Sequence, residues 1–320
     1  MKNITLALSL LLVGLVVFPL ASTAANKTNS NILPSPEKLT EHVYAWIGPL
    51  DGPSKENQGY RMNLLFVVGK EAVAVVDTGY TEAIAEEMLA HIKRITPVPV
   101  KFAINSNSQP HRFMGNPVFR RAGAQIITHE KSAARMEKQA SNYATAIESI
   151  LELKPGSVKL PSPPDKIING DTELDLGGLT IKLWDFGAAH TPTQLVIEVA
   201  QDKLVYTGDL LYSDRLLAVI ADSNVENWLT AYNHLNQFKD ALFVPGHGQP
   251  GKLATFDFPT RQYLTLIFDH MTKMVEEGVD IQDAINQLDQ SRFSKLANYE
   301  DLAGRNASWT YLEREAAAFE

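Results

Sequence analysis

The first part of the chain alternates short hydrophobic runs with turns that contain glycine. The runs at 43–47, 62–68 and 72–76 are rich in β-branched and aromatic residues. Such runs, bounded by turn residues, predict successive β-strands. Apolar residues at helical spacing follow over 81–94, and Pro97 closes that segment. We therefore expect a β-meander that leads into a helix.

The next region predicts an alternation of strands and helices. Strands are expected at 101–104 and 125–128, with a short helix at 113–121 between them. One long helix is expected at 131–153, because its apolar residues fall on a single helical face. That face indicates packing against a core rather than a cofactor site.

A second β-rich region covers 166–212, where glycines separate short hydrophobic runs. A capping box at 223–226 begins a helix, a last strand is expected at 241–244, and the chain is largely helical from 258 onward. Two β-rich halves, each followed by helices, predict an α/β fold. Its expected form is an αββα sandwich, in which two mixed β-sheets pack face to face with helices on both outer faces.

The N-terminal residues have the pattern of a secretory signal. Lys2 precedes an apolar run at 4–20, and small residues follow at 21–25. The run is marginal for a bilayer core of about 30 Å, so we expect cleavage rather than a stable membrane anchor. The expected organisation is a signal peptide at 1–25, a linker at 26–38 and a single domain at 39–320. This pattern predicts a periplasmic or secreted bacterial protein.

The amino-acid composition limits the kinds of molecule that the protein is expected to bind. The chain has 320 residues and a formal net charge of -8, which argues against a nucleic-acid surface. It contains no cysteine, so neither disulfides nor thiolate metal ligands are available. We expect a small-molecule substrate or ligand, and a protein partner is the alternative.

Three segments each place one metal-ligand type of side chain beside glycine, just past a predicted strand. They contain His190, Asp209 and His247. Loops at strand ends are where sites are commonly built. Each residue also has a structural explanation, because an Asp beside Gly can fix a turn and a His can bond a carbonyl group.

Taken together, these segments resemble the metallo-β-lactamase superfamily of metal-dependent hydrolases. Val75 to Gly79, the loop at 105–116 and the three segments above follow in that family's order. The resemblance covers most of the chain after the signal peptide and implies the αββα fold. Residues 115–119 and 190–193 are similar to those of periplasmic members associated with quinoprotein or sulfur-oxidation systems.

The loop at 105–116 departs from the family pattern. Active members carry His-x-His-x-Asp-His there, whereas this chain has Asn107, Gln109, His111 and Arg112 at the four ligand positions. An amide oxygen is a poorer ligand for Zn²⁺ than an imidazole nitrogen. The positive charge of Arg112 also opposes a cation nearby. A dinuclear site is therefore not expected.

The other ligand positions are matched. The resemblance implies that His190 is a ligand of the first metal, that Asp209 is the bridging carboxylate and that His247 is a ligand of the second metal. It also implies that Asp77 supports the ligands without binding a metal itself. His111, Asp209 and His247 form a set with two imidazoles and one carboxylate, which can hold one Zn²⁺ or Fe²⁺. His190 would be a fourth ligand or handle a proton.

Three functional hypotheses remain open. The first is a mononuclear hydrolase of an ester, thioester, amide or lactam bond, with His190 as general acid and with Gln109 or Arg112 orienting the substrate. The second is a catalytically inactive relative that serves as a binding or accessory protein. The third is metal-free hydrolysis with His190 or His111 as the catalytic base. No Gly-x-Ser-x-Gly motif supports a serine esterase.

Overall fold

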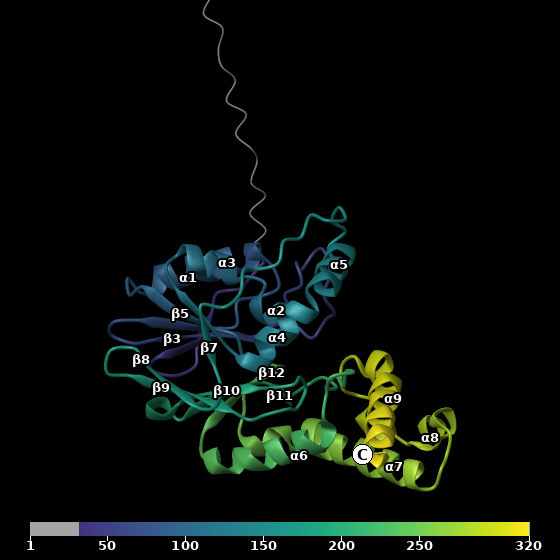
Figure 1. Ribbon diagram of the computed structural model, residues 1–320. Helices are drawn as coiled ribbons and strands as arrows, with labels where there is room; N and C mark the ends of the chain where they lie inside the picture. The colour runs from purple at the N-terminus through teal and green to yellow at the C-terminus, as the bar shows by residue number, and fades with distance from the viewer. Residues whose placement is uncertain (1–31, 320) are drawn as a thin grey trace, which may run out of the picture. The chain divides into compact units, whose positions relative to one another are not determined.

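The computed structural model describes residues 32–319, and the predicted signal peptide and the start of the linker lie outside them. Two β-sheets form the centre of the described part (Figure 1). The seven-stranded sheet has the order β1 to β7: β1 (Glu37–Lys38), β2 (Val43–Trp46), β3 (Leu64–Val68), β4 (Val73–Val76), β5 (Val100–Ile104), β6 (Gln125–His129) and β7 (Lys166–Ile168). The five-stranded sheet has the order β12 (Leu242–His247), β11 (Leu204–Tyr212), β10 (Leu195–Val199), β9 (Thr180–Asp185) and β8 (Thr172–Asp175).

Helices cover the outer faces of both sheets. The helices are α1 (Glu82–Ile95), α2 (Pro110–Phe113), α3 (Asn116–Arg121), α4 (Glu130–Lys138), α5 (Ala140–Ile150), α6 (Val225–His234), α7 (Tyr263–Glu276), α8 (Ile281–Gln287) and α9 (Tyr299–Ala318). Short helical turns lie at η1 (Ala200–Asp202), η2 (Leu235–Phe238), η3 (Leu253–Phe256), η4 (Asp257–Gln262) and η5 (Ser291–Phe293). In Figure 1, α1 and α3 lie outside the first sheet, and α6 lies outside the second. The predicted αββα architecture is confirmed.

Each layer boundary has its own apolar core. One buried cluster lies between the sheets and includes Leu65, Val67, Ile197 and Val199. A second lies between the first sheet and its helices, and a third joins the second sheet to α6, α7 and α9. Strands buried on both faces consist of continuous hydrophobic runs, as in β3. This accounts for the hydrophobic runs from which the strands were predicted.

The structure differs from the predicted elements at the long helix and in the linker, and the helix expected at 113–121 is divided into the end of α2 and α3. The helix expected at 131–153 is divided into α4 and α5, because Gln139 leaves the helical conformation between them. Apolar spacing continues on both sides of Gln139, so periodicity cannot reveal the break. Within the segment expected to be a linker, Leu33 is buried and Glu37–Lys38 pairs with β2.

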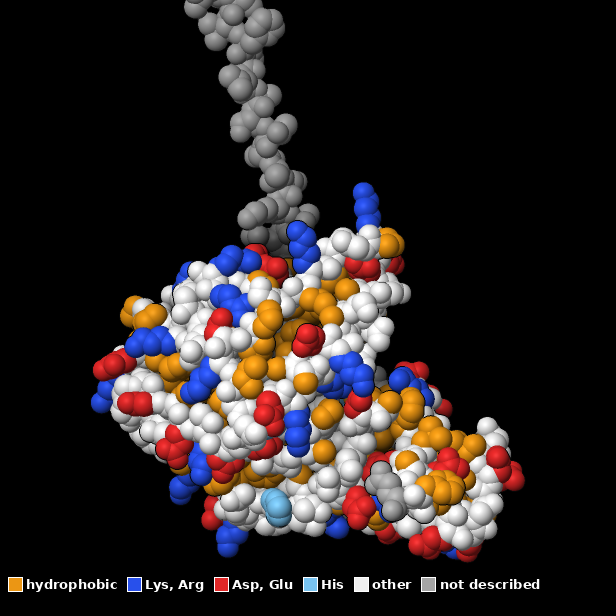
Figure 2. Space-filling model, viewed as in Figure 1, with side chains coloured by type: hydrophobic (Ala, Val, Ile, Leu, Met, Phe, Trp, Pro, Cys, Tyr) orange, Lys and Arg blue, Asp and Glu red, His pale blue; other side chains and the backbone are white. Residues whose placement is uncertain are grey.

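One face of the domain carries an apolar hollow. Hydrophobic side chains gather in it over the region of α4 (Figure 2). The hollow has a volume of about 480 Å³ and lies between α4 and the proline-containing segment 160–164. Among the described residues, no helix is long and apolar enough to cross a membrane.

Candidate metal centre

The candidate site lies where β11 and β12 run parallel at one end of the second sheet. Asp209 is inside β11 and His247 ends β12, so neither is in a turn beyond its strand as the sequence predicted. The register between the strands shifts on both sides of Gly208. A Cβ atom at Gly246 would lie 2.4 Å from Asp209 Oδ1, so only glycine permits this close approach.

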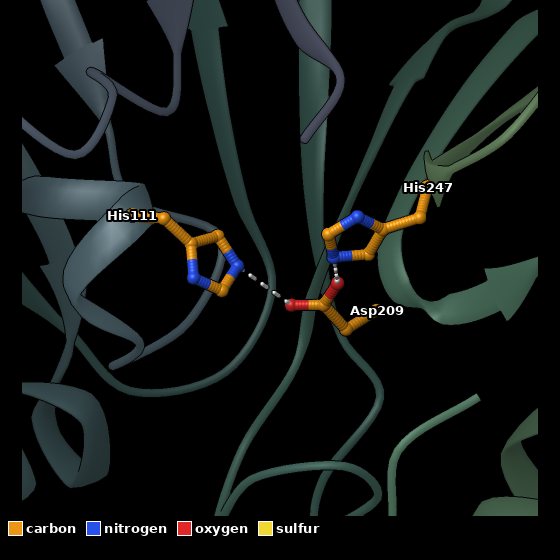
Figure 3. Close-up of side chains that lie close together, drawn as sticks. All are labelled: His111, Asp209 and His247. Atoms are coloured by element: carbon orange, nitrogen blue, oxygen red, sulfur yellow. Dashed lines mark ion pairs between the residues drawn. The ribbon is translucent and has the colours of Figure 1, made fainter. Parts of the chain in front are cut away.

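His111, Asp209 and His247 converge from three segments of the chain (Figure 3). One ligand atom from each lies within 4.8 Å of the others. The Nε2 atoms of His111 and His247 lie 3.8 Å and 3.4 Å from the Asp209 carboxylate. Asp209 is fully buried, and the side chains of His111 and His247 are only 14% and 3% exposed. The structure thus brings these three predicted residues together.

The hydrogen bonds around His247 fix which ring nitrogen carries the proton. Its Nδ1 lies 2.7 Å from the carbonyl oxygen of Arg61, which can only accept, so Nδ1 donates. The Nε2 of the neutral ring is then an acceptor facing a carboxylate. Burial and the charge of Arg215 hold the pKa of His247 well below its usual range, despite the opposing effect of Asp209.

His111 is also a buried imidazole with a lowered pKa. Its Nε2 is buried and has no hydrogen-bond partner. Burial, followed by the charge of Arg112, lowers the pKa of His111 to about 3. The Nε2 atoms of two neutral imidazoles and a carboxylate therefore face one another, and the His111 nitrogen has no hydrogen-bond partner, an arrangement that a bound cation would satisfy.

Arg112 places a permanent positive charge on the other side of Asp209. Its NH2 and Nε atoms donate to the two Asp209 oxygens at 2.6 Å and 3.3 Å. Its NH1 atom donates to Asp77 at 3.1 Å and to the Tyr206 hydroxyl at 2.8 Å. The side chain is fully buried, and its planar guanidinium bridges the two carboxylates.

The charges of the two carboxylates follow from these contacts. Burial alone would raise the pKa of Asp209, but Arg112 and the neighbouring donors outweigh it and hold the pKa well below its usual range. Asp77 is also fully buried, and burial raises its pKa against the effect of Arg112. Asp77 accepts from the Ser106 amide and hydroxyl, both at 2.8 Å, and so fixes the start of the site loop.

Asn107 and Gln109 act as hydrogen-bond donors in the site. The Asn107 amide donates to Asp209 at 2.7 Å and to Gln194 at 3.1 Å. The Gln109 amide lies 3.2 Å from Nε2 of His190, whose Nδ1 lies 2.8 Å from the carbonyl oxygen of Ala218. His190 therefore donates through Nδ1 and accepts from Gln109, and it lies outside the group of three.

Several residues that build the site were not found from the sequence. Asn63 is fully buried, and its amide donates to the carbonyl groups of Pro245 and Gly248, which holds the end of β12 in place. Arg61 and Arg215 flank His247. These three residues lie outside the segments with a ligand pattern, so only their contacts identify them.

The fold and the site define an αββα protein with a buried Asp–His–His group that could hold a metal. The metallo-beta-lactamase superfamily model matches residues 61–247, which is more than half of the chain. The chain belongs to the metallo-β-lactamase superfamily. The family predicted from the motifs is confirmed, whereas the periplasmic quinoprotein and sulfur-oxidation subfamily stays a prediction.

Solved structures agree in fold. A metallo-beta-lactamase from Pontibacter korlensis superposes with a TM-score of 0.59 at 22% sequence identity, and the match covers 72% of this chain and 98% of that one. The DIM-1 metallo-beta-lactamase gives a TM-score of 0.57 at 16% identity, with 73% and 98% covered. The VMB-1 structure gives 0.57 at 18% identity, with 72% and 95% covered. At these identities the comparisons establish the fold.

Proposed function

We propose that this protein is an exported hydrolase of the metallo-β-lactamase superfamily with a mononuclear site. The site would hold one divalent ion, Zn²⁺ or Fe²⁺, between His111, Asp209 and His247. The observation that carries the proposal is the convergence of one ligand atom each from His111, Asp209 and His247 within 4.8 Å of one another, with the His111 Nε2 buried and unpartnered.

The residues fit such an ion. The low pKa values of both imidazoles keep them neutral, as metal ligands must be. The hydrogen bond from His247 Nδ1 to the Arg61 carbonyl fixes the ring with Nε2 toward the site. Bonds of this kind orient the ligands of metal centres generally. Two imidazoles and one carboxylate are a known ligand set for Zn²⁺ and for Fe²⁺.

Arg112 supports a single ion rather than two. Its guanidinium bonds both oxygens of Asp209, the carboxylate that bridges two metals in the family pattern. Asn107 also donates to that carboxylate, so little acceptor capacity is left for a second ion. The fixed charge of Arg112 thus takes the place of the second metal.

During hydrolysis of an ester, thioester, amide or lactam bond, the side chains of this protein would hold the ligands in position and transfer a proton. A bound ion of this kind lowers the pKa of water and polarises a carbonyl group. Arg112 and Asn107 hold the Asp209 carboxylate in position. His190 is oriented by the Ala218 carbonyl and Gln109 with a lone pair on Nε2, so it would take a proton from the attacking water and then deliver that proton to the leaving group.

A second candidate function is binding without catalysis. It is favoured by the replacement of all four ligand positions in the 105–116 loop. In that case the buried network around Arg112 would order the loops around the site, and the ligand would be a small molecule or a protein partner.

Metal content separates the two functions. Protein isolated without chelator is compared with the His111→Ala and His247→Ala variants by inductively coupled plasma mass spectrometry. His234→Ala is the matched control, because His234 is exposed on α6. We expect about one equivalent of Zn or Fe in the wild type and the control, and a loss in both site variants. Absence of metal in all four proteins, even with excess Zn²⁺, would reject the hydrolase proposal.

A further inference from the structure

The apolar hollow between α4 and the segment 160–164 has the size of a site for a small molecule. Its volume is about 480 Å³, and ligand pockets commonly measure about 300–1,000 Å³. The buried side chains of Phe113 and Met136 contribute to its lining, and hydrophobic side chains gather in it (Figure 2). None of the three candidate metal ligands lines it. The hollow is therefore a cavity that the proposed hydrolysis does not use.

Both walls of the hollow are held in place by contacts of their own. Arg120 donates to the carbonyl group of Pro163 at 2.6 Å and forms an ion pair with Asp165 at 3.1 Å. Three of the five residues of that wall are prolines, whose rings fix the backbone φ angle. On the opposite wall, Arg135 of α4 donates to Asp222 at 2.9 Å. The hollow is thus already formed, so a ligand would not have to order its walls on binding.

The lining of the hollow offers little to an anion. Pro161, Pro163 and Pro164 have no N–H group, so the proline-containing wall has few backbone donors. The charged side chains in the lining are those of Glu130 and Glu137. An anionic ligand would meet two carboxylates and few donors there, whereas a cation would meet charges of the opposite sign.

The protein itself does not pair the charges of Glu130 and Glu137. Both side chains are exposed and lie seven residues apart on one face of α4. Between them, the positions three and four residues from each glutamate are Ala133 and Ala134, which cannot form an ion pair. Among the described residues, no lysine or arginine forms an ion pair with either glutamate, and Arg135 of the same helix pairs with Asp222 instead.

The stability of helix α4 does not explain both glutamates. Glu130 lies in the first turn, where the helix dipole favours a negative charge. Glu137 lies in the last turn, where the same dipole disfavours one. Its carboxylate is therefore placed against the preference of the helix and beside an apolar cavity.

We propose that the hollow binds a small organic cation, a protonated amine with an apolar body. The body would fill the apolar cavity, and the amine would lie at the rim that carries Glu130 and Glu137. Burial of the apolar body supplies most of the affinity. Because the rim is exposed to water, its charges select a cation over a neutral molecule by a modest factor. This site does not depend on the proposed hydrolase function.

Binding is measured on the whole, chelator-treated protein by NMR at neutral pH, with the alanine methyl groups isotopically labelled. The probes are phenylbutylammonium, phenylbutanol and phenylbutanoate, which share one apolar body and differ in charge. We expect the methyl signals of Ala133, Ala134 and Ala140 to shift on titration, because these residues line the hollow. Phenylbutylammonium should bind at least about threefold more tightly than phenylbutanol, and phenylbutanoate more weakly than both.

Two changes to α4 separate the effect of charge from that of shape. A double variant, Glu130→Gln with Glu137→Gln, should bind phenylbutylammonium no more tightly than phenylbutanol and keep its affinity for phenylbutanol. Glu276→Gln is the matched control, because Glu276 is exposed on α7, and it should leave all three affinities unchanged. Ala133→Trp places a large side chain in the hollow and should abolish binding of all three probes.

Four results would overturn the cation site. In the wild type, phenylbutanol or phenylbutanoate could bind as tightly as phenylbutylammonium. The double variant could keep the preference for the ammonium, or Ala133→Trp could bind as the wild type does. Finally, the same methyl signals could shift with protein concentration in the absence of any probe, which would show that a second copy of the chain covers the hollow. All samples are free of metal, so failure of the hydrolase proposal leaves this test intact.

Discussion

Replacing Arg112 by Met tests whether its guanidinium supplies the charge that holds the site together. The side chain is fully buried and pairs with Asp209 at 2.6 Å and Asp77 at 3.1 Å. Removing one partner of a buried ion pair costs about 3–5 kcal/mol, and here two carboxylates lose the same partner. The expected loss is therefore about 5 kcal/mol, a large part of a typical stability of about 5–15 kcal/mol. It corresponds to a fall in Tm of about 10 °C or more.

The assay is urea unfolding followed by circular dichroism, with chelator present. Arg120→Met is the matched control, because the Arg120–Asp165 pair at 3.1 Å is partly exposed. Such a pair is worth no more than about 1 kcal/mol. A loss from Arg112→Met as small as that of the control would refute the reasoning.

The stability difference between Arg112→Met and the wild type should depend on pH in a definite direction. In the wild type, the lowered pKa of Asp209 contributes stability above its unfolded pKa of about 3.9, and this stability is lost as pH falls through the folded pKa. Without Arg112, burial raises the pKa of Asp209, so the ionised carboxylate destabilises the fold at neutral pH. The difference between variant and wild type should shrink as pH falls from 7 toward 4. A difference that grows would contradict this account.

Two further predictions address the site and its support. His190→Ala should retain the metal measured by mass spectrometry but lose turnover of any ester or lactam that the wild type hydrolyses, because His190 lies outside the ligand group; loss of metal would make His190 a ligand. Gly115→Ala should lower Tm through a cost of roughly 1–3 kcal/mol, because its Cβ would lie 2.0 Å from the Thr78 carbonyl oxygen. Gly304→Ala has open space within helix α9 and should raise stability by up to about 1 kcal/mol, and equal effects of the two changes would contradict the packing argument.

Hydrophobic patterning predicted most of the fold because the strands are buried on both faces. The runs at 43–47 and 72–76 correspond to β2 and β4, whose ends are set by turn residues. The break at Gln139 was missed because the apolar spacing continues across it. Asp209 and His247 were expected beyond their strands, since glycine and proline usually end strands, but close pairing of β11 with β12 keeps them within.

The site was predicted less completely than the fold. The motif order indicated His111, Asp209 and His247, and the structure places them together. Their role as metal ligands stays a prediction. The sequence also suggested that Arg112 opposes a cation, but not that it bonds two buried carboxylates. Arg61 and Arg215 come from separate segments, and nothing in local patterning indicates that they meet beside His247.

The stoichiometry of Zn²⁺ bound by metal-free wild-type protein tests the central claim most directly. Isothermal titration calorimetry with a parallel Arg112→His titration would count the ions. We predict one ion per wild-type chain, because Arg112 holds the place of the second. We predict a second, weaker ion in Arg112→His, where an imidazole replaces the guanidinium. Two ions in the wild type, or none in either protein, would contradict a mononuclear centre.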